Sequence, residues 1–246
     1  MDQKISVYQC GRYTACDTWK KIETLKLDRI FYVNSGWARM YFNNEEHILK
    51  EGYLYFFSRF KTFDMVEHSN FDHSYYEFNY THPFNTASFM EIYARDNELH
   101  HLFEFGNKII EDVQNTRDLN SKTIAKFLET ALVHIDTHYS LPLIRNDYVL
   151  KALGIMDKNY ATTSVSEIAD ILNINKDHFI RLFKKETGVT PMKHLQAYRL
   201  TLGKDMLKSG KSVIETSVKC GYSSPASFYY AYKKRFGYPP SEKTKL

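Results

Sequence analysis

The sequence has few cysteines and no long apolar stretch. Its 246 residues contain three cysteines, Cys10, Cys16 and Cys220, and their spacing fits neither a disulfide framework nor a zinc site. No apolar run approaches the roughly 18 residues of a membrane span, and the N-terminus lacks the pattern of a secretory leader. We therefore expect a soluble, cytoplasmic protein without a membrane segment. Its length suits two domains or one large one.

Clustered metal ligands are also missing. His47, His68 and His73 are scattered, and no His-x-His sequence occurs. His134 and His138 have the spacing of metal ligands on a helix, but a third ligand and the glutamate of a zinc-protease motif are absent, so a solvated helix face accounts for them. We identify no metal, no cofactor and no nucleophile paired with a base. The sequence therefore does not predict an enzyme.

The charge is unevenly distributed along the chain, although the net charge is only +4. Residues 160–246 contain 15 Lys and Arg against 7 Asp and Glu, a net charge of +8, whereas residues 1–159 carry −4. A basic C-terminal third beside an acidic remainder is typical of a nucleic-acid-binding module attached to a second domain. A solvated basic face is the alternative that charge alone leaves open.

A repeat occupies the basic part of the chain. The first copy begins at Ser164 and the second at Ser212, an offset of 48 residues. Three residues later each copy has a glutamate, Glu167 or Glu215, and this spacing predicts a capping box at the start of a helix. Internal repeats of this size are the signature of a duplicated structural unit. Each copy therefore predicts one helical hairpin.

The joint between the two helices of each copy has matching chemistry. A small residue is needed where the helices cross, and Ala169 and Ser217 supply it at equivalent places. Four residues later come Asn173 and Gly221, the residue types that most readily adopt a positive φ. The second helices are expected to begin after capping residues, which are Asn175 and, before Pro225, Ser224. The pattern indicates two helix-turn-helix units.

A long helix is predicted between the copies. It starts at Thr190-Pro191, carries apolar residues at helical spacing and stops at Ser209-Gly210. About 19 residues at ~1.5 Å each give a rod of about 28 Å. Successive major grooves on one face of B-DNA lie about 34 Å apart. A rod of this length could place both second helices on one face of double-stranded DNA.

These motifs resemble those of the AraC/XylS family of bacterial transcription regulators. The resemblance is strongest over residues 145–241. It rests on Ile168-Ala169, the run from Arg181 to Gly188, Thr190-Pro191 and the closing run from Phe236 to Ser241. It implies a DNA-binding domain of two helix-turn-helix units joined by a long helix. Members of the family usually activate transcription and contact RNA polymerase.

The N-terminal part shows short β-rich runs separated by turn residues. One run, Arg29–Val33, is expected to close at Asn34-Ser35-Gly36, and further separate strands are expected at Thr62–Val66 and Ser74–Tyr80. This pattern predicts a small β-barrel or sandwich, and the family resemblance implies a cupin-like barrel that often holds a small effector.

Residues 86–138 are predicted to be helical. In the family, helices here often pair two subunits, so the resemblance implies a homodimer, but packing within one chain explains their apolar stripes equally well. The predicted fold class is therefore α+β, with a cupin-like sensor or dimerisation domain and its helices at 1–140 and an all-α DNA-binding domain at 141–246. Leu141-Pro142 marks the boundary, and Asp147–Asp157 is the first expected helix beyond it.

Aromatic residues are frequent in the predicted barrel, and they suit either a core or an effector pocket. Strand alternation places Trp37, Arg39 and Tyr41 on one face, and these three are the candidate pocket residues. The run that begins at Arg59 departs from the family pattern, so a ligand identity is not carried over.

DNA-contacting residues are expected on the second helix of each copy. Arg181 occupies the family's usual base-reading position, whereas the equivalent position in the second copy is Tyr230, so we expect the first copy to carry more of the sequence specificity. The candidate base-contacting residues are Lys176, Asp177, Ile180, Arg181, Ala226, Ser227 and Tyr230. The candidate phosphate-contacting residues are Lys184, Lys185, Lys233, Lys234 and Arg235.

Two other functions compete with an effector-controlled regulator, which we expect to be an activator. One is a regulator whose N-terminal domain binds no small molecule and acts through a protein partner. The other is a cupin enzyme fused to a DNA-binding domain, and the missing metal cluster counts against it.

Overall fold

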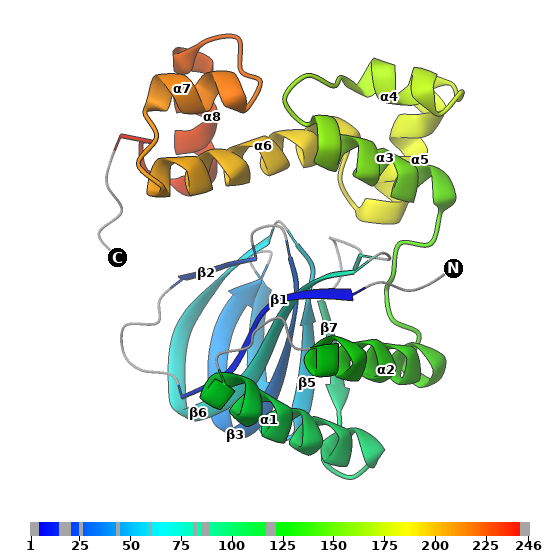
Figure 1. The fold of residues 1–246 in the computed structure, drawn as a ribbon, viewed down its shortest axis with the longest axis vertical. Coiled ribbons are helices and arrows are strands. Elements are labelled where there is room, and N and C mark those ends of the chain that lie inside the picture. The colour runs from blue at the N-terminus through cyan, green and yellow to red at the C-terminus, as the bar shows by residue number, and fades with distance from the viewer. Residues whose placement is uncertain are drawn as a thin grey trace. The chain divides into compact units, whose positions relative to one another are not determined.

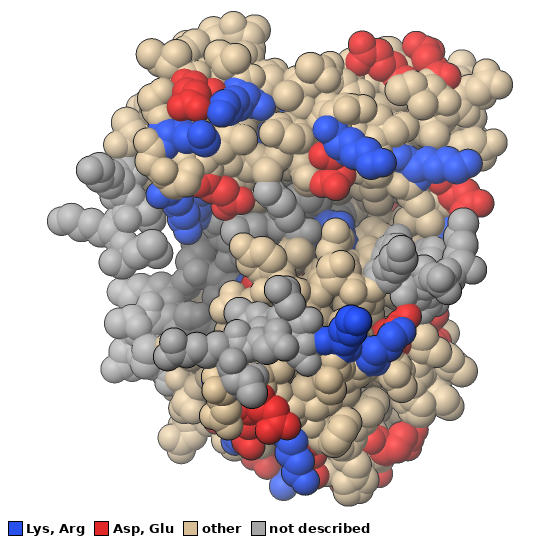
Figure 2. Space-filling view, viewed as in Figure 1, with Lys and Arg blue, Asp and Glu red and all other residues tan. Residues whose placement is uncertain are grey.

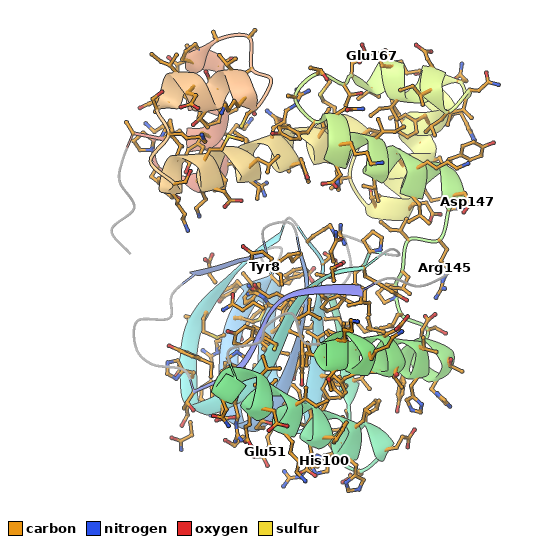
Figure 3. All side chains as sticks on the ribbon, in the orientation of Figure 1. Tyr8, Glu51, His100, Arg145, Asp147 and Glu167 are labelled. Carbon is orange, nitrogen blue, oxygen red and sulfur yellow. The ribbon has the colours of Figure 1, made fainter. Side chains whose placement is uncertain are left out.

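The computed structural model describes residues 5–14, 21–24, 27–42, 45–59, 61–80, 83–84, 89–116 and 122–241. The chain divides into two compact units, Met1–Ile144 and Arg145–Leu246. The boundary predicted from the sequence lies four residues earlier, at 140/141. Arg145 and Asp147 lie in the segment that enters the second unit (Figure 3).

The first unit is built around one antiparallel sheet (Figure 1). Its hydrogen-bonded order is β1-β6-β3-β5-β7, with β2 paired to β6 and β4 paired to β3. The strands are β1 (Ile5–Thr14), β2 (Lys21–Thr24), β3 (Asp28–Phe42), β4 (Glu45–Lys50), β5 (Tyr53–Phe57), β6 (Lys61–Tyr80) and β7 (Phe89–Tyr93). The two longest strands, β3 and β6, pair along almost their whole length and form its spine.

The expectation of a closed β-barrel is wrong. Within the described ranges the pairing path ends at β1 on one side and β7 on the other, and no ladder joins these two strands. A barrel needs its edge strands to pair with each other. Here β1 instead packs against two helices, α1 (Glu98–Thr116) and α2 (Lys122–Tyr139). The sheet is therefore open.

A shared irregularity bends the two long strands. A strand was predicted to end at Asn34-Ser35-Gly36, but β3 continues through these residues. Likewise, the predicted separate strands Thr62–Val66 and Ser74–Tyr80 are parts of one strand, β6. Gly36 has φ +74° and faces Asn70, which has φ +48°. The ladder register shifts on either side of Ser35. Asn34-Ser35-Gly36 thus form a bulge and not a turn, because the parts of β3 before and after them both pair with β6.

Both faces of the sheet are buried by apolar side chains. Ile30, Tyr32 and Phe56 belong to a core that they share with α1 and α2. The alternating residues Phe31 and Phe57 belong to a second core on the opposite face. This double burial explains the continuous apolar runs in β3 and β5. The predicted helical region 86–138 begins later than expected, because residues 89–93 form β7 and extend the sheet beyond β5.

The second unit is entirely helical in its described residues. Its helices are α3 (Asp147–Asn159), α4 (Val165–Ile171), α5 (Lys176–Thr187), α6 (Pro191–Lys208), α7 (Val213–Lys219) and α8 (Pro225–Phe236). The long helix α6 contacts α5 as well as α7 and α8, and it runs between the two helical hairpins (Figure 1). Its 18 residues correspond to about 27 Å.

The predicted helix starts are confirmed. Ser164 and Glu167 form a reciprocal capping box at α4. Ser212 caps α7, but Glu215 there turns to Lys211 and Lys219, so only half of the second predicted box is present. The remaining predicted caps are Asn175 at α5, Thr190 at α6 and Ser224 at α8. Local sequence fixed these ends, because each cap satisfies backbone N–H groups within its own first turn.

None of the described helices has both the length and the apolar content that a bilayer crossing requires.

Substituting Gly36 by alanine should destabilise the sheet unit. The new Cβ would lie 2.2 Å from the backbone oxygen of Asn70, at a φ of +74° that alanine adopts only with strain. We expect the free energy of unfolding to fall by about 1–3 kcal/mol in urea denaturation. Gly154→Ala, in α3 and with no atom within 4 Å of the added Cβ, is the control and should be neutral or stabilising. Equal effects of the two substitutions would contradict the role of the bulge.

Candidate nucleic-acid interface and ligand cavity

The two helical hairpins of the second unit have the same turn, bond for bond. In the first, the backbone N–H of Asn173 donates to the Asp170 carbonyl at 3.0 Å and that of Ile174 to the Ala169 carbonyl at 3.1 Å. In the second hairpin, 48 residues on, Gly221 bonds to Val218 at 3.0 Å and Tyr222 to Ser217 at 3.0 Å. The duplication predicted from the sequence is therefore present in the backbone hydrogen bonds.

The residues that were expected to make this turn occupy the expected conformations. Asn173 has φ +53° and Gly221 has φ +73°. Ala169 and Ser217 are buried at the corner, where a larger side chain would push the helices apart. The Ser217 hydroxyl donates to the Ile214 carbonyl at 2.8 Å, which satisfies its polar group inside the core. Both copies are thus helix-turn-helix units.

The second helix of each unit is called its recognition helix, which is α5 in the first unit and α8 in the second. The recognition helix α5 has a polar exposed surface. Phe179 and Phe183 are buried, and they hold one side of α5 against the rest of the unit. The candidate contact residues Lys176, Asp177, Arg181, Lys184 and Lys185 are exposed, and Ile180 is half-buried. The structure therefore places the candidate residues of this copy on the accessible side of one helix.

The second recognition helix, α8, is less uniform. Tyr230 has 72% of its surface exposed, and Ala226, Lys233 and Lys234 are exposed as well. Ser227 is half-buried, and its hydroxyl belongs to the capping box with Ser224. Half-buried Arg235 lies with its guanidinium 5.6 Å from the centre of the Phe236 ring. Of the residues expected to contact DNA here, Ser227 thus also caps the helix, and Arg235 also packs against a neighbouring ring.

Charge on the helical unit is mixed on the face that Figure 2 shows. Lys and Arg side chains lie there beside Asp and Glu side chains, so this view does not present a continuous basic surface.

Arg199 joins α6 to the loop ahead of the first hairpin, and it was not among the residues predicted from the sequence. Its Nε donates to the Tyr160 carbonyl at 2.6 Å, and its Nη2 donates to the carbonyls of Thr163 at 3.0 Å and Ala161 at 3.4 Å. These three carbonyls belong to the loop between α3 and α4. A role for Arg199 could have been predicted from the sequence, because it is a charged residue between Tyr198 and Leu200, which are both buried on this helix.

The turn of the second hairpin rests on the same loop. A Cβ added to Gly221 would lie 1.9 Å from the Ala161 carbonyl oxygen, so the backbones pack at a distance that only glycine permits. Burial lowers the pKa of Arg199 and raises the pKa of neighbouring Tyr222 to about 12. Arg199 remains a cation at neutral pH because its ordinary pKa is so high. The loop from Tyr160 to Thr163 is thus clamped between α6 and the second turn.

Comparison with known proteins identifies this domain. A model described as a helix-turn-helix domain matches residues 168–245. The probable transcriptional regulator LumQ of Photobacterium leiognathi is 30% identical over 79 residues, which are 32% of this chain and 32% of LumQ. The lactose operon transcription activator of Staphylococcus xylosus is 29% identical over 101 residues, 40% of this chain and 36% of the activator.

The C-terminal domain of this chain is therefore similar to the helix-turn-helix domains of bacterial transcription regulators, as the AraC/XylS resemblance predicted. The chain spans about a third of the length of these two relatives.

The fold of this chain resembles that of ToxT from Vibrio cholerae over nearly its whole length. The TM-score is 0.63 at 12% identity, and the alignment covers 97% of both chains. An N-terminal sheet followed by a helical helix-turn-helix domain is therefore a known arrangement. Another structure of ToxT holds an unsaturated fatty acid.

The candidate pocket residues of the sheet unit lie away from its cavity. Arg39 pairs with Glu67 at 3.3 Å and with Glu46 at 3.8 Å, and the Tyr41 hydroxyl donates to Glu46 at 3.0 Å. Trp37 alternates with buried Ala38 on the same strand. A cavity of about 220 Å³ is lined instead by Gln9, Tyr13, Arg29, Phe31, His73, Tyr75 and Glu77.

The histidines considered as metal ligands have other contacts. His73 is buried and stacks on Phe71, and the His47 ring lies 4.0 Å from the Phe89 ring. His134 contacts Glu98, and His138 contacts the His134 carbonyl. In the part of the chain that the structure describes, no three His, Cys, Asp or Glu residues are grouped to hold a metal ion.

Substituting Gly221 by alanine should loosen the contact between the hairpins. Gly221 and Gly210 both have positive φ, +73° and +88°, but only at Gly221 would a new Cβ meet another segment. We expect Gly221→Ala to accelerate amide hydrogen exchange at Thr162 and Thr163, measured on the full chain. Gly210→Ala carries the same backbone strain without the clash and is the control, which should leave these amides unchanged. Equal exchange in both variants would show that the contact does not hold the loop.

Proposed function

We propose that this protein is a bacterial, sequence-specific transcription regulator that binds a double-stranded DNA operator through both helix-turn-helix units. The observation that carries the proposal is the bond-for-bond repetition of the turn, because it marks a duplicated helix-turn-helix unit. The second recognition helix, α8, begins one residue later after its turn than α5 does. A recognition helix reads bases with exposed residues near its N-terminus. On α5 the exposed candidates are Lys176, Asp177 and Arg181, and on α8 they are Ala226 and Tyr230.

In this proposal the first hairpin carries most of the sequence specificity. Arg181 is exposed on α5, and a guanidinium can bond two acceptors of guanine in the major groove. In the second hairpin, Tyr230 is the exposed residue at the equivalent position, and the Ser227 hydroxyl is already engaged in its cap. The second hairpin therefore contributes affinity more than selectivity.

Phosphate contacts come from the later turns of the recognition helices. Lys184 and Lys185 on α5 and Lys233 and Lys234 on α8 are exposed, and each pair occupies the last turn of its helix. These contacts would be sensitive to salt, because each cation that meets a phosphate releases a condensed counterion. Arg235 would contribute less than the lysines, because its guanidinium packs over Phe236.

We further propose that the protein activates transcription through RNA polymerase in the cytoplasm. The name of the Staphylococcus xylosus relative supports activation. The sheet unit would supply effector binding, dimerisation or both. Phe105 on α1 and Val133 on α2 are exposed apolar residues, which suits a homodimer contact through these helices.

Control by a small effector is favoured over control by a protein partner alone. The specific observation is the cavity on the sheet, which has a charged pair at one end and aromatic walls. A catalytic role for the sheet unit has less support, since the described residues offer no group of metal ligands.

Arg181→Ala should relax base preference at one operator position. An operator would first be selected by the native chain from random DNA, and the affinities for its single-base variants would then be measured. We expect the discrimination at one base pair to fall by roughly 1–3 kcal/mol, because a bidentate contact is lost. An unchanged preference at every position would contradict the proposed role of Arg181.

Lys233→Ala should weaken binding to all sequences alike. It should also reduce the slope of log affinity against log salt concentration by about one, because one phosphate contact is removed. The measurement is a salt titration of affinity for the selected operator and for an unrelated duplex. Lys151→Ala, an exposed lysine on α3, is the control and should leave the slope unchanged. A loss confined to the selected operator would instead make Lys233 a base-reading residue.

A further inference from the structure

The cavity of the sheet unit is built by three neighbouring strands in register. On β1, β6 and β3, Gln9 lies opposite Glu77, which lies opposite Arg29. Two residues further along the strands, Gly11, Tyr75 and Phe31 form the next row. Since side chains alternate along a strand, both rows and the row that follows them share one face of the sheet.

The middle of the cavity is aromatic. Phe31 and His73 are buried with their ring centres 4.4 Å apart, and Tyr75 is half-buried beside them. Glycine at position 11 allows this packing, because an added Cβ would lie 2.9 Å from the Tyr75 hydroxyl oxygen. The cavity is thus lined by aromatic rings, which offer apolar surface to an aromatic ligand.

One end of the cavity is an ion pair. The Arg29 Nη2 donates to Glu77, and the side chains of the two residues are only 11% and 15% exposed. The Arg29 guanidinium also lies 5.8 Å from the centre of the Phe31 ring. Its buried Nε has no hydrogen-bond partner within the described ranges. The cavity lining thus contains a guanidinium beside a carboxylate acceptor.

The protonation of these groups leaves the cavity close to neutral. Burial lowers the pKa of Arg29 to about 10, so it stays a cation at neutral pH. Burial also lowers the pKa of His73 to about 3, so its ring is uncharged. Among the described residues that line the cavity, Glu77 is the carboxylate that balances the positive charge of Arg29.

We propose that this cavity binds a small, uncharged aromatic molecule that carries a carboxamide or an equivalent pair of adjacent acceptor and donor atoms. The ligand's carbonyl would accept from Arg29, its N–H would donate to Glu77, and its ring would lie between Phe31 and Tyr75. The inference rests on the proposed function, in which this molecule is the effector.

The charge balance selects an uncharged ligand over either ion. A carboxylate that approaches Arg29 must also approach Glu77, and a cation that approaches Glu77 must also approach Arg29. Either ion leaves a net charge in a poorly solvated place, which is costly. A carboxamide satisfies both partners and leaves the charge balance unchanged.

The size of the cavity limits the ligand to about one ring. At about 220 Å³ it is smaller than the roughly 300–1,000 Å³ of sites that hold drug-sized molecules. A single six-membered ring with one polar substituent suits this space.

Three probes of the same shape and different charge test the proposal. Benzamide, benzoate and benzamidine would be titrated into the full chain at neutral pH, with binding followed by ligand-observed nuclear magnetic resonance. We expect benzamide to bind at least about tenfold more tightly than either ion. Tighter binding of benzoate or benzamidine, equal binding of all three, or no binding of any would overturn the proposal.

Removing the charge of Glu77 or of Arg29 should change which of the three probes binds best. Glu77→Gln removes the negative charge and should turn the preference towards benzoate, whereas Arg29→Gln should turn it towards benzamidine. Arg39→Gln is the control, because Arg39 also belongs to an ion pair on β3 but does not line the cavity. A preference that is unchanged in both cavity variants would overturn the assignment of the pair.

These outcomes do not depend on DNA binding. The probe series on the native chain stands without the variants, so a variant that fails to fold does not remove the test. Failure of the native chain to select any operator from random DNA would contradict the proposed function and leave the titrations unaffected. Failure of all three probes, with intact operator recognition, would contradict only this inference.

Discussion

The contact between the second turn and the loop ahead of the first hairpin determines how the helical unit can work. Gly221 packs on the Ala161 carbonyl, and Arg199 binds three carbonyls of the same loop from α6. Without this contact, the two hairpins would be joined by one helix and free to rotate as that helix bends. With it, the spacing of the recognition helices is set by packing and hydrogen bonds as well as by the length of α6.

This arrangement has consequences for how specificity is divided. When the two recognition helices are held rigidly, they reach the DNA together. The helix with the weaker base contacts then still adds affinity once the other has bound, as linked binding modules do. The side chains of the two helices agree with this division of sequence specificity, because α5 begins with polar residues whereas α8 exposes a phenol and small side chains. The buried Thr216 hydroxyl, which has no partner among the described residues, indicates that the second hairpin is also the less completely satisfied of the two.

The sheet unit depends on a different constraint, the common bend of β3 and β6. Gly36 and Asn70 face each other in positive-φ conformations, and the strands continue on both sides of them. Because side chains alternate along this strand pair, it supplies two cores, one shared with α1 and α2 and one on the opposite face. The cavity lies on the part of the sheet where β1 joins these strands, and the aromatic residues divide between filling the cores and lining the cavity.

The sequence by itself determined the helical unit almost completely. Caps at Ser164, Asn175, Thr190 and Ser224 and turn residues at Asn173 and Gly221 act within a few residues of themselves, so their effect is visible in a linear pattern. Only the tertiary structure decided whether the sheet would close, whether Asn34-Ser35-Gly36 would end a strand, and where a cavity would form. The partners of Arg199 lie 36 to 39 residues away, and Arg29 meets Glu77 48 residues away. Such contacts depend on the register between distant segments, which no local pattern records.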